Sequence, residues 1–128
     1  MNSVARVMVL CAGVSLAMTA AAGALEECMI KGDHPAVTRC LIDADHEAQA
    51  ALLKAEGDAG KRARALDTAT GRAGAAAALA RSMRGFVDYR KAQCDFVRAM
   101  YASGAGADKG QLGCVVDLTR RRVRDLQN

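Results

Sequence analysis

The feature that most constrains the fold of this short, alanine-rich chain is a set of four of its five cysteines: Cys28, Cys40, Cys94 and Cys114. The fifth, Cys11, lies in an N-terminal leader that is described below. A domain of about 100 residues can bury only a modest core, so covalent cross-links add much to its stability. An even number of cysteines in a small exported domain is typical of two disulfides. Structural zinc sites use close CxxC pairs, which this spacing lacks. The sequence therefore predicts two disulfides and no metal site.

Four cysteines allow three connectivities, and the sequence alone does not choose rigorously between them. We favour Cys28–Cys40 and Cys94–Cys114, because each bridge closes a short local loop. On the chain-entropy account, each such loop stabilises a fold by about 3 kcal/mol. Cys114 lies off the centre of the apolar stripe of its helix, which would place the second bridge at the edge of a helix contact.

Residues 1–24 have the pattern of a secretory signal peptide. Arg6 is the only charged side chain, an apolar run follows over residues 7–22, and Ala22-Gly23-Ala24 supplies the small residues that a signal peptidase requires. We expect cleavage before Leu25. The apolar run is short for a bilayer span and ends in small residues, so the pattern favours export over a membrane anchor.

A lipoprotein signal is the second alternative for this leader, with Cys11 as the lipid-bearing residue. Met8-Val9-Leu10 before it lacks the small residues expected there, and we reject this alternative. Loss of Arg6 with the leader leaves 17 basic and 14 acidic side chains, a net charge of +3. We expect a periplasmic or secreted protein without stable membrane insertion after cleavage.

Residues 25–128 are predicted to form one all-α domain, a bundle of about three antiparallel helices packed through Ala-rich faces. The chain is rich in Ala, has a single proline and almost no β-branched runs. We expect helices over about residues 35–59, 75–102 and 110–126. Between the first two, a bend is expected within residues 67–74.

The segment from Leu25 to Arg39 is expected to be mostly irregular, with a turn at Lys31-Gly32-Asp33. Asp33 or His34 can cap the first helix, whose first turn then carries Pro35.

Each expected helix has residues at helical spacing that should face inward. In the first helix these are Val37, Leu41, Ala44, Ala48, Ala51 or Leu52, and Ala55. In the second they are Phe86, Tyr89, Gln93, Phe96, Val97 and Met100. In the third they are Leu112, Val115, Val116, Thr119, Val123 and Leu126. The second set holds most of the aromatic residues and is expected to be the hub of the core.

Three segments carry a resemblance to a known family: Phe86-x-x-Tyr89-Arg90-x-x-x-Cys94, a Ser-Gly turn, and Cys114-x-x-x-x-Thr119-x-x-Arg122-x-x-x-Leu126. Together they resemble the LprI-type lysozyme inhibitor family. Cys28 and Cys40, followed by Leu41 and an Ala-rich helix, resemble the N-terminal half of that family's domain. The sequence departs from the family pattern at Phe86, where Trp is usual, and at Ser103-Gly104-Ala105-Gly106, which replaces a Gly-Gly-Ser turn. The resemblance implies a helical domain that binds another protein.

No pattern of catalytic residues is evident, and we expect neither enzymatic activity nor a cofactor. The serines and cysteines form no nucleophile motif, and no Gly-rich phosphate loop follows a strand. Asp43, His46 and Glu47 share one helix face at metal-like spacing. A metal site needs ligands that converge from several elements, so we interpret these three residues as a solvated helix face.

The candidate residues for partner binding are Asp33, His34, Arg90 and Arg122. Arg90 lies beside the aromatic stripe, where a guanidinium needs an acid or carbonyl partner, and Asp45 is one candidate. Arg122 is likewise interpreted as an arginine that is paired within the fold. The basic cluster at residues 120–124 suits the C-terminus of a helix, where positive charge is stabilised by the helix dipole. Because we expect the protein to be exported, we do not expect this cluster to bind nucleic acid.

Two functions fit these observations. In the first, the protein inhibits lysozyme by occluding its cleft, with Asp33 and His34 at the tip of the loop closed by Cys28 and Cys40. Animal-type lysozymes are themselves cationic, so a partner of charge +3 gains no long-range steering. In the second, it is a structural or stress-related envelope module that inhibits nothing, and its Cys28–Cys40 loop is a plain N-terminal staple.

Overall fold

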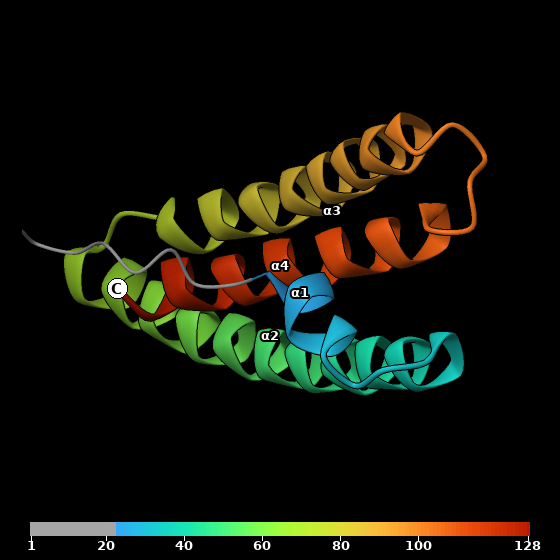
Figure 1. Cartoon of the computed structure of the whole chain (residues 1–128). Helices are drawn as coiled ribbons and strands as arrows, with labels where there is room; N and C mark the ends of the chain where they lie inside the picture. The colour runs from blue at the N-terminus through green and yellow to red at the C-terminus, as the bar shows by residue number, and fades with distance from the viewer. Residues whose placement is uncertain (1–22) are drawn as a thin grey trace, which may run out of the picture.

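A computed structural model describes residues 23–128 as four α-helices and no strand within that range. The helices are α1 (Ala24–Met29), α2 (His34–Thr70), α3 (Ala75–Met100) and α4 (Ala107–Gln127). The three long helices lie side by side with α4 between α2 and α3, and the short α1 lies across α2 and α4 (Figure 1). The all-α prediction is confirmed, with one short helix more than expected. The predicted leader, including Arg6 and Cys11, lies outside the described residues apart from its last two.

Helix α2 begins as the sequence predicted but ends later. Asp33 caps it, because its Oδ1 accepts the backbone N–H of Ala36 at 2.8 Å. The helix was expected to end near residue 59, but it continues to Thr70 and stops at Gly71, whose φ of 65° suits glycine. An interior glycine costs about 1 kcal/mol. Leu52, Ala55 and Ala59 pack in a cluster with Leu126 on both sides of Gly57, and Arg62 donates to the carbonyl of Leu126 in the turn beyond Gly60.

Helix α1 replaces most of the irregular segment that was expected before residue 34. Six residues are too few to hold a helix on their own, so tertiary contacts must fix it. Cys28 is bonded to Cys40 of α2, and the N–H of Ala24 donates to Asp117 of α4 at 2.8 Å. These long-range partners could not be assigned to this segment from local sequence.

Helix α3 is rotated relative to the prediction, and its aromatic stripe is not the hub of the core. Tyr89, Phe96 and Met100 are 53%, 58% and 69% exposed. Its most buried residue is Cys94, which is bonded to Cys114. This disulfide, with the partly buried Phe86 packed near Leu126, turns the neighbouring face toward α4. Phe86, Gln93 and Val97 of the predicted stripe are partly buried, so the buried face of α3 lies nearer to Cys94 than the helical spacing predicted.

Helix α4 is the central element, and its predicted inner face is confirmed. Val116, Thr119 and Leu126 are buried, and the other three predicted residues are partly buried. The core consists of two clusters joined along this helix. One gathers around Leu41 and Val116 beneath α1, and the other lies around Leu52 and Leu126 at the far end. The inner stripe of α2 supplies both clusters as predicted, with Leu52 rather than Ala51 at the ambiguous position.

Candidate functional site

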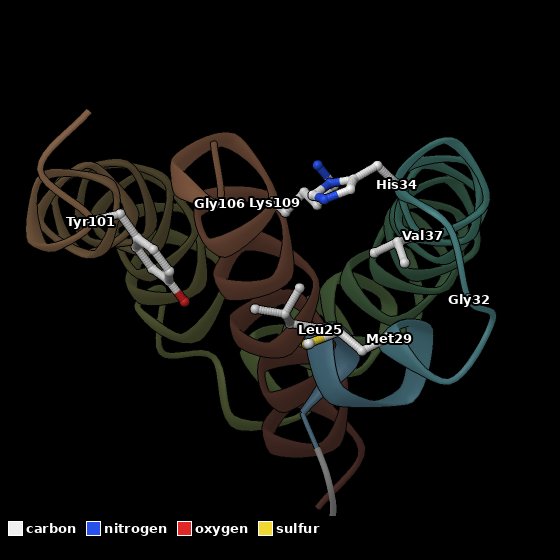
Figure 2. A pocket seen from close by; sticks show the side chains of 8 residues that line it. All are labelled: Leu25, Met29, Gly32, His34, Val37, Tyr101, Gly106 and Lys109. Atoms are coloured by element: carbon white, nitrogen blue, oxygen red, sulfur yellow. The ribbon is translucent and has the colours of Figure 1, made fainter. Parts of the chain in front are cut away.

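A groove of about 400 Å³ lies at the end of the bundle where α2 and α4 begin and α3 ends. We call it the end groove. It is lined by Leu25, Met29, Gly32, His34, Val37, Tyr101, Gly106 and Lys109. Figure 2 shows side chains from α1, from the start of α2, from the end of α3 and from α4 around the same space. The bundle therefore offers a concave surface built from all four helices.

Two glycines of α4, Gly110 and Gly113, allow two lining residues of the end groove to approach this helix closely. A Cβ on Gly110 would lie 2.4 Å from Cε2 of Tyr101, so the tyrosine ring rests directly on the helix backbone. A Cβ on Gly113 would lie 3.0 Å from the Cβ of Leu25. Without side chains at these positions, α1 and the end of α3 approach α4 closely enough to frame the groove.

The end groove is apolar inside and basic at its edge. Leu25, Met29 and Val37 supply aliphatic surface, while His34 and Lys109 are its ionisable basic groups. None of the lining residues is acidic. An arrangement of this kind suits a partner that inserts an apolar side chain and presents a carboxylate beside it.

The two predicted residues at the tip of the Cys28–Cys40 loop have different roles. His34 lines the end groove. Asp33 instead uses its carboxylate to cap α2, so it supports the loop and the helix start. Of this pair, His34 is the better candidate for partner contact.

The predicted Arg90 and Arg122 lie away from the end groove, between α3 and α4. Both guanidinium groups lie over the ring of Phe86, with their carbons 5.3 and 5.6 Å from its centroid. Arg90 donates to the hydroxyl of Thr119 at 2.8 Å, so the suggested pairing with Asp45 is wrong. Thr119 is completely buried and donates in turn to the carbonyl of Val115 at 2.7 Å. Arg90 is therefore tied to a fully satisfied polar contact within the bundle.

Arg122 has a weaker set of partners than Arg90. One of its nitrogens donates to the hydroxyl of Ser82 at 2.8 Å, while its buried Nε has no hydrogen-bond partner among the described residues. It lines a separate hollow of about 290 Å³ together with Tyr89 and Arg121. Of the remaining C-terminal arginines, Arg120 forms a salt bridge of 2.8 Å with Glu27 of α1. The structure thus does not bring the four predicted contact residues into one site.

Asp43, His46 and Glu47 lie exposed on the outer face of α2. Across residues 23–128, no group of three or more His, Cys, Asp or Glu side chains is arranged to hold a metal ion. In the same range, no helix has the length and apolar character needed to cross a membrane.

Sequence reasoning missed Tyr101 and Lys109 as lining residues of the end groove, and it missed Gly110 as the position against which the Tyr101 ring packs. The available signal was an aromatic residue at the end of one helix followed by two glycines three positions apart in the next helix. That spacing places both glycines on one helix face, but only the tertiary fold shows which groups approach them.

The fold and the groove define a small helical protein, cross-linked by two disulfides, with a surface suited to binding a protein partner. Residues 28–126 match the sequence model of the family described as lysozyme inhibitor LprI, and the chain belongs to that family. Searches of curated proteins and of solved structures found no match. The family resemblance inferred from the cysteine and arginine pattern is thus confirmed.

The motif residues of the family resemblance lie mainly in the scaffold. The four cysteines form the predicted bridges, Cys28–Cys40 and Cys94–Cys114, and Arg90 is bonded to Thr119. Of the residues that line the end groove, Gly106 belongs to the turn of that motif, and the other seven lie outside its named positions. Family membership therefore accounts for the helical scaffold of this protein, and it says less about the partner that would bind in the end groove.

Proposed function

We propose that the protein is an exported binding protein of the cell envelope that inhibits lysozyme without covalent chemistry, through the end groove. The observation that supports this function is an apolar groove with two basic groups, His34 and Lys109, and no acidic lining residue. Glycosidases of the lysozyme type carry two carboxyl groups in their cleft. A basic, apolar surface is complementary to such a cleft at short range.

On this proposal the protein binds through a preformed, rigid surface and has no enzymatic activity or cofactor. The Cys28–Cys40 bridge fixes α1 on α2, and the close approach of Leu25 to Gly113 fixes it on α4. A groove wall that is ordered before binding loses little conformational entropy on association. The leader pattern of residues 1–24 supports periplasmic or secreted localisation, where the partner is a protein and not nucleic acid.

The test measures lysozyme turnover on peptidoglycan with a molar excess of the oxidised protein recovered after export. We expect inhibition by the natural chain and at least about tenfold weaker inhibition by the double variant His34→Ala, Lys109→Ala, since one lost charged contact corresponds to roughly 1.5–3 kcal/mol. The matched control is His46→Ala, Lys61→Ala, which removes the same side-chain types from exposed positions on α2. It should inhibit like the natural chain.

Unchanged lysozyme turnover, together with no binding at low salt, would remove lysozyme as the target. Equal losses in both double variants would show a general charge effect and would exclude the end groove as the contact. Because both proteins are cationic, moderate salt should not weaken association, in contrast to a pair of oppositely charged proteins.

A second candidate function is an envelope interaction module that inhibits nothing. The observation that favours it is the exposed apolar stripe of Tyr89, Phe96 and Met100 on α3, on a different part of the bundle from the groove. Contiguous exposed apolar side chains often mark protein contacts. If Phe96→Asp abolishes binding to an envelope protein while the groove variant retains it, this second function is favoured.

A further inference from the structure

The first two described residues are built into the fold through Asp117 of α4. The N–H of Ala24 donates to Oδ1 of Asp117 at 2.8 Å, and the alanine itself is fully buried in the cluster around Leu41 and Val116. The carbonyl of Gly23 accepts the N–H of Glu27 at 3.0 Å, which closes the first turn of α1. Residues 23 and 24 therefore behave as part of the domain.

Gly23 is in close contact with the same carboxylate. A Cβ at this position would lie 2.8 Å from Oδ2 of Asp117. Because the nitrogen and the Cβ share one Cα, the Gly23 nitrogen lies within about 5 Å of that oxygen. A positive charge on this nitrogen would be stabilised by the carboxylate.

We propose that the leader is removed between Ala22 and Gly23, and that the new N-terminal ammonium of Gly23 pairs with Asp117. The host signal peptidase adds water across this peptide bond, which leaves a carboxylate on Ala22 and an ammonium group on Gly23. Ala20 and Ala22 supply small residues at the third and first positions before the bond, as Ala22 and Ala24 do for the next candidate. The proposal rests on the proposed export and replaces the expected cleavage before Leu25.

Cleavage before Leu25 would damage the fold in two ways. It would remove the buried Ala24 from the core and the N–H that Asp117 accepts. It would also place the new charge on the Leu25 nitrogen, 3.3 Å from where a Cβ of Gly113 would lie. That nitrogen faces the backbone of α4, where an ammonium group loses part of its hydration.

The first measurement is the intact mass and the N-terminal sequence of the protein after export of the full chain with its own leader. We expect a chain that begins at Gly23. A start at Leu25, any other start, or retention of the leader would overturn the proposal. Lysozyme inhibition is measured in a separate assay. A chain that begins at Gly23 but does not inhibit lysozyme would exclude the proposed target and would still support cleavage between Ala22 and Gly23.

The second measurement compares two exported chains in which a foreign leader is joined directly before Gly23 or before Leu25. We expect the urea midpoint of the Gly23 chain to be higher by about 0.5 M or more. Asp117→Asn should lower the midpoint of the Gly23 chain and leave that of the Leu25 chain nearly unchanged. Equal midpoints for the two chains, or equal effects of Asp117→Asn on both, would contradict the ion pair.

Discussion

At the scale of single residues, Arg90 shows how a motif residue can serve the fold. Its guanidinium lies over Phe86 and donates to Thr119, whose hydroxyl is fully buried. The sequence predicted correctly that this arginine would need a partner beside the apolar stripe. It suggested an acid or a carbonyl, because a buried charge is usually paired with one. The Thr119 hydroxyl meets the need, because it accepts from Arg90 and donates its own hydrogen bond to the carbonyl of Val115; no local pattern reveals that pairing.

Thr119→Val is expected to lower the free energy of unfolding by about 1–3 kcal/mol, although it makes a buried position more apolar. The change keeps the side-chain shape but leaves Arg90 without its hydrogen-bond acceptor. The control is Thr70→Val, where the hydroxyl bonds to the carbonyl of Leu66 at 2.8 Å on an exposed helix end. Urea unfolding should show a change within about 0.5 kcal/mol for the control. Equal effects of the two variants would show that the Arg90 contact contributes nothing.

Gly110→Ala tests the close contact between Tyr101, which lines the end groove, and the backbone of α4. The new methyl group would overlap the ring of Tyr101, so the ring must turn out of place. The matched control is Gly57→Ala, an exposed position in α2 with open space around a Cβ, where helix propensity should add about 1 kcal/mol of stability. We expect the free energy of unfolding of Gly110→Ala to fall below that of the control by about 1–3 kcal/mol.

Adding Tyr101→Ala to Gly110→Ala should restore most of the lost stability, because it removes the overlapping ring. If Gly110→Ala alone stabilises the protein as much as Gly57→Ala does, the close contact between Tyr101 and the helix backbone is wrong.

At the scale of elements, the junction of α2 and α3 depends on a carboxylate that the sequence did not mark. Asp67 lies in the last turn of α2 and accepts the backbone N–H groups of Ala75 and Ala76 at 2.8 and 3.1 Å. These groups start α3, whose flanking Gly74 offers no side-chain cap. The bonds to Ala76 and then to Ala75 hold the pKa of Asp67 below its usual value near 3.8. A residue in the last turn of α2 thus caps the start of α3.

The capping contribution of Asp67 should depend on pH. Since its pKa is lower in the folded state, its stabilising effect is present above the unfolded pKa and is lost as pH falls through the folded value. Asp67→Ala should therefore lower the urea midpoint clearly at pH 7, and the difference from the natural chain should shrink below about pH 4. Asp58→Asn, which breaks exposed salt bridges to Lys54 and Lys61, should have a smaller effect at pH 7. A constant effect of Asp67→Ala from pH 7 to pH 3 would contradict capping by the ionised carboxylate.

The elements also show where local sequence is sufficient and where it is not. The stripe of α2 was predictable because small and aliphatic residues recur on a single face, which packs mainly against α4 and also contacts α1 and α3. Helix α3 has apolar residues on more than one face, so spacing alone could not decide which face is buried. The Cys94–Cys114 bridge decides it, and Tyr89 and Phe96 become exposed as a result. The short α1 was missed because its contacts, to Cys40 and Asp117, are distant in the sequence.

At the scale of the whole molecule, the two disulfides support different parts of the structure. Cys94–Cys114 joins two long helices that are also held by the Arg90–Thr119 contact. Cys28–Cys40 instead fixes a six-residue helix that supplies Leu25 and Met29 to the end groove. The first bridge therefore acts mainly on global stability, and the second acts on stability and on the shape of the groove.

Removal of either bridge by Cys→Ala changes should lower the free energy of unfolding by about 3 kcal/mol, since the loops span 12 and 20 residues. Their effects on binding should differ. Without Cys28–Cys40, α1 is too short to stay ordered by itself, so the groove loses one wall and inhibition should fall steeply. The variant without Cys94–Cys114 should still inhibit under conditions where it is folded, because Tyr101 continues to rest on Gly110. Urea unfolding measures the effect on stability, and the lysozyme assay, run without urea where both variants are folded, measures the effect on inhibition. Equal loss of inhibition in the two variants would mean that the groove depends on the bundle as a whole and not on α1.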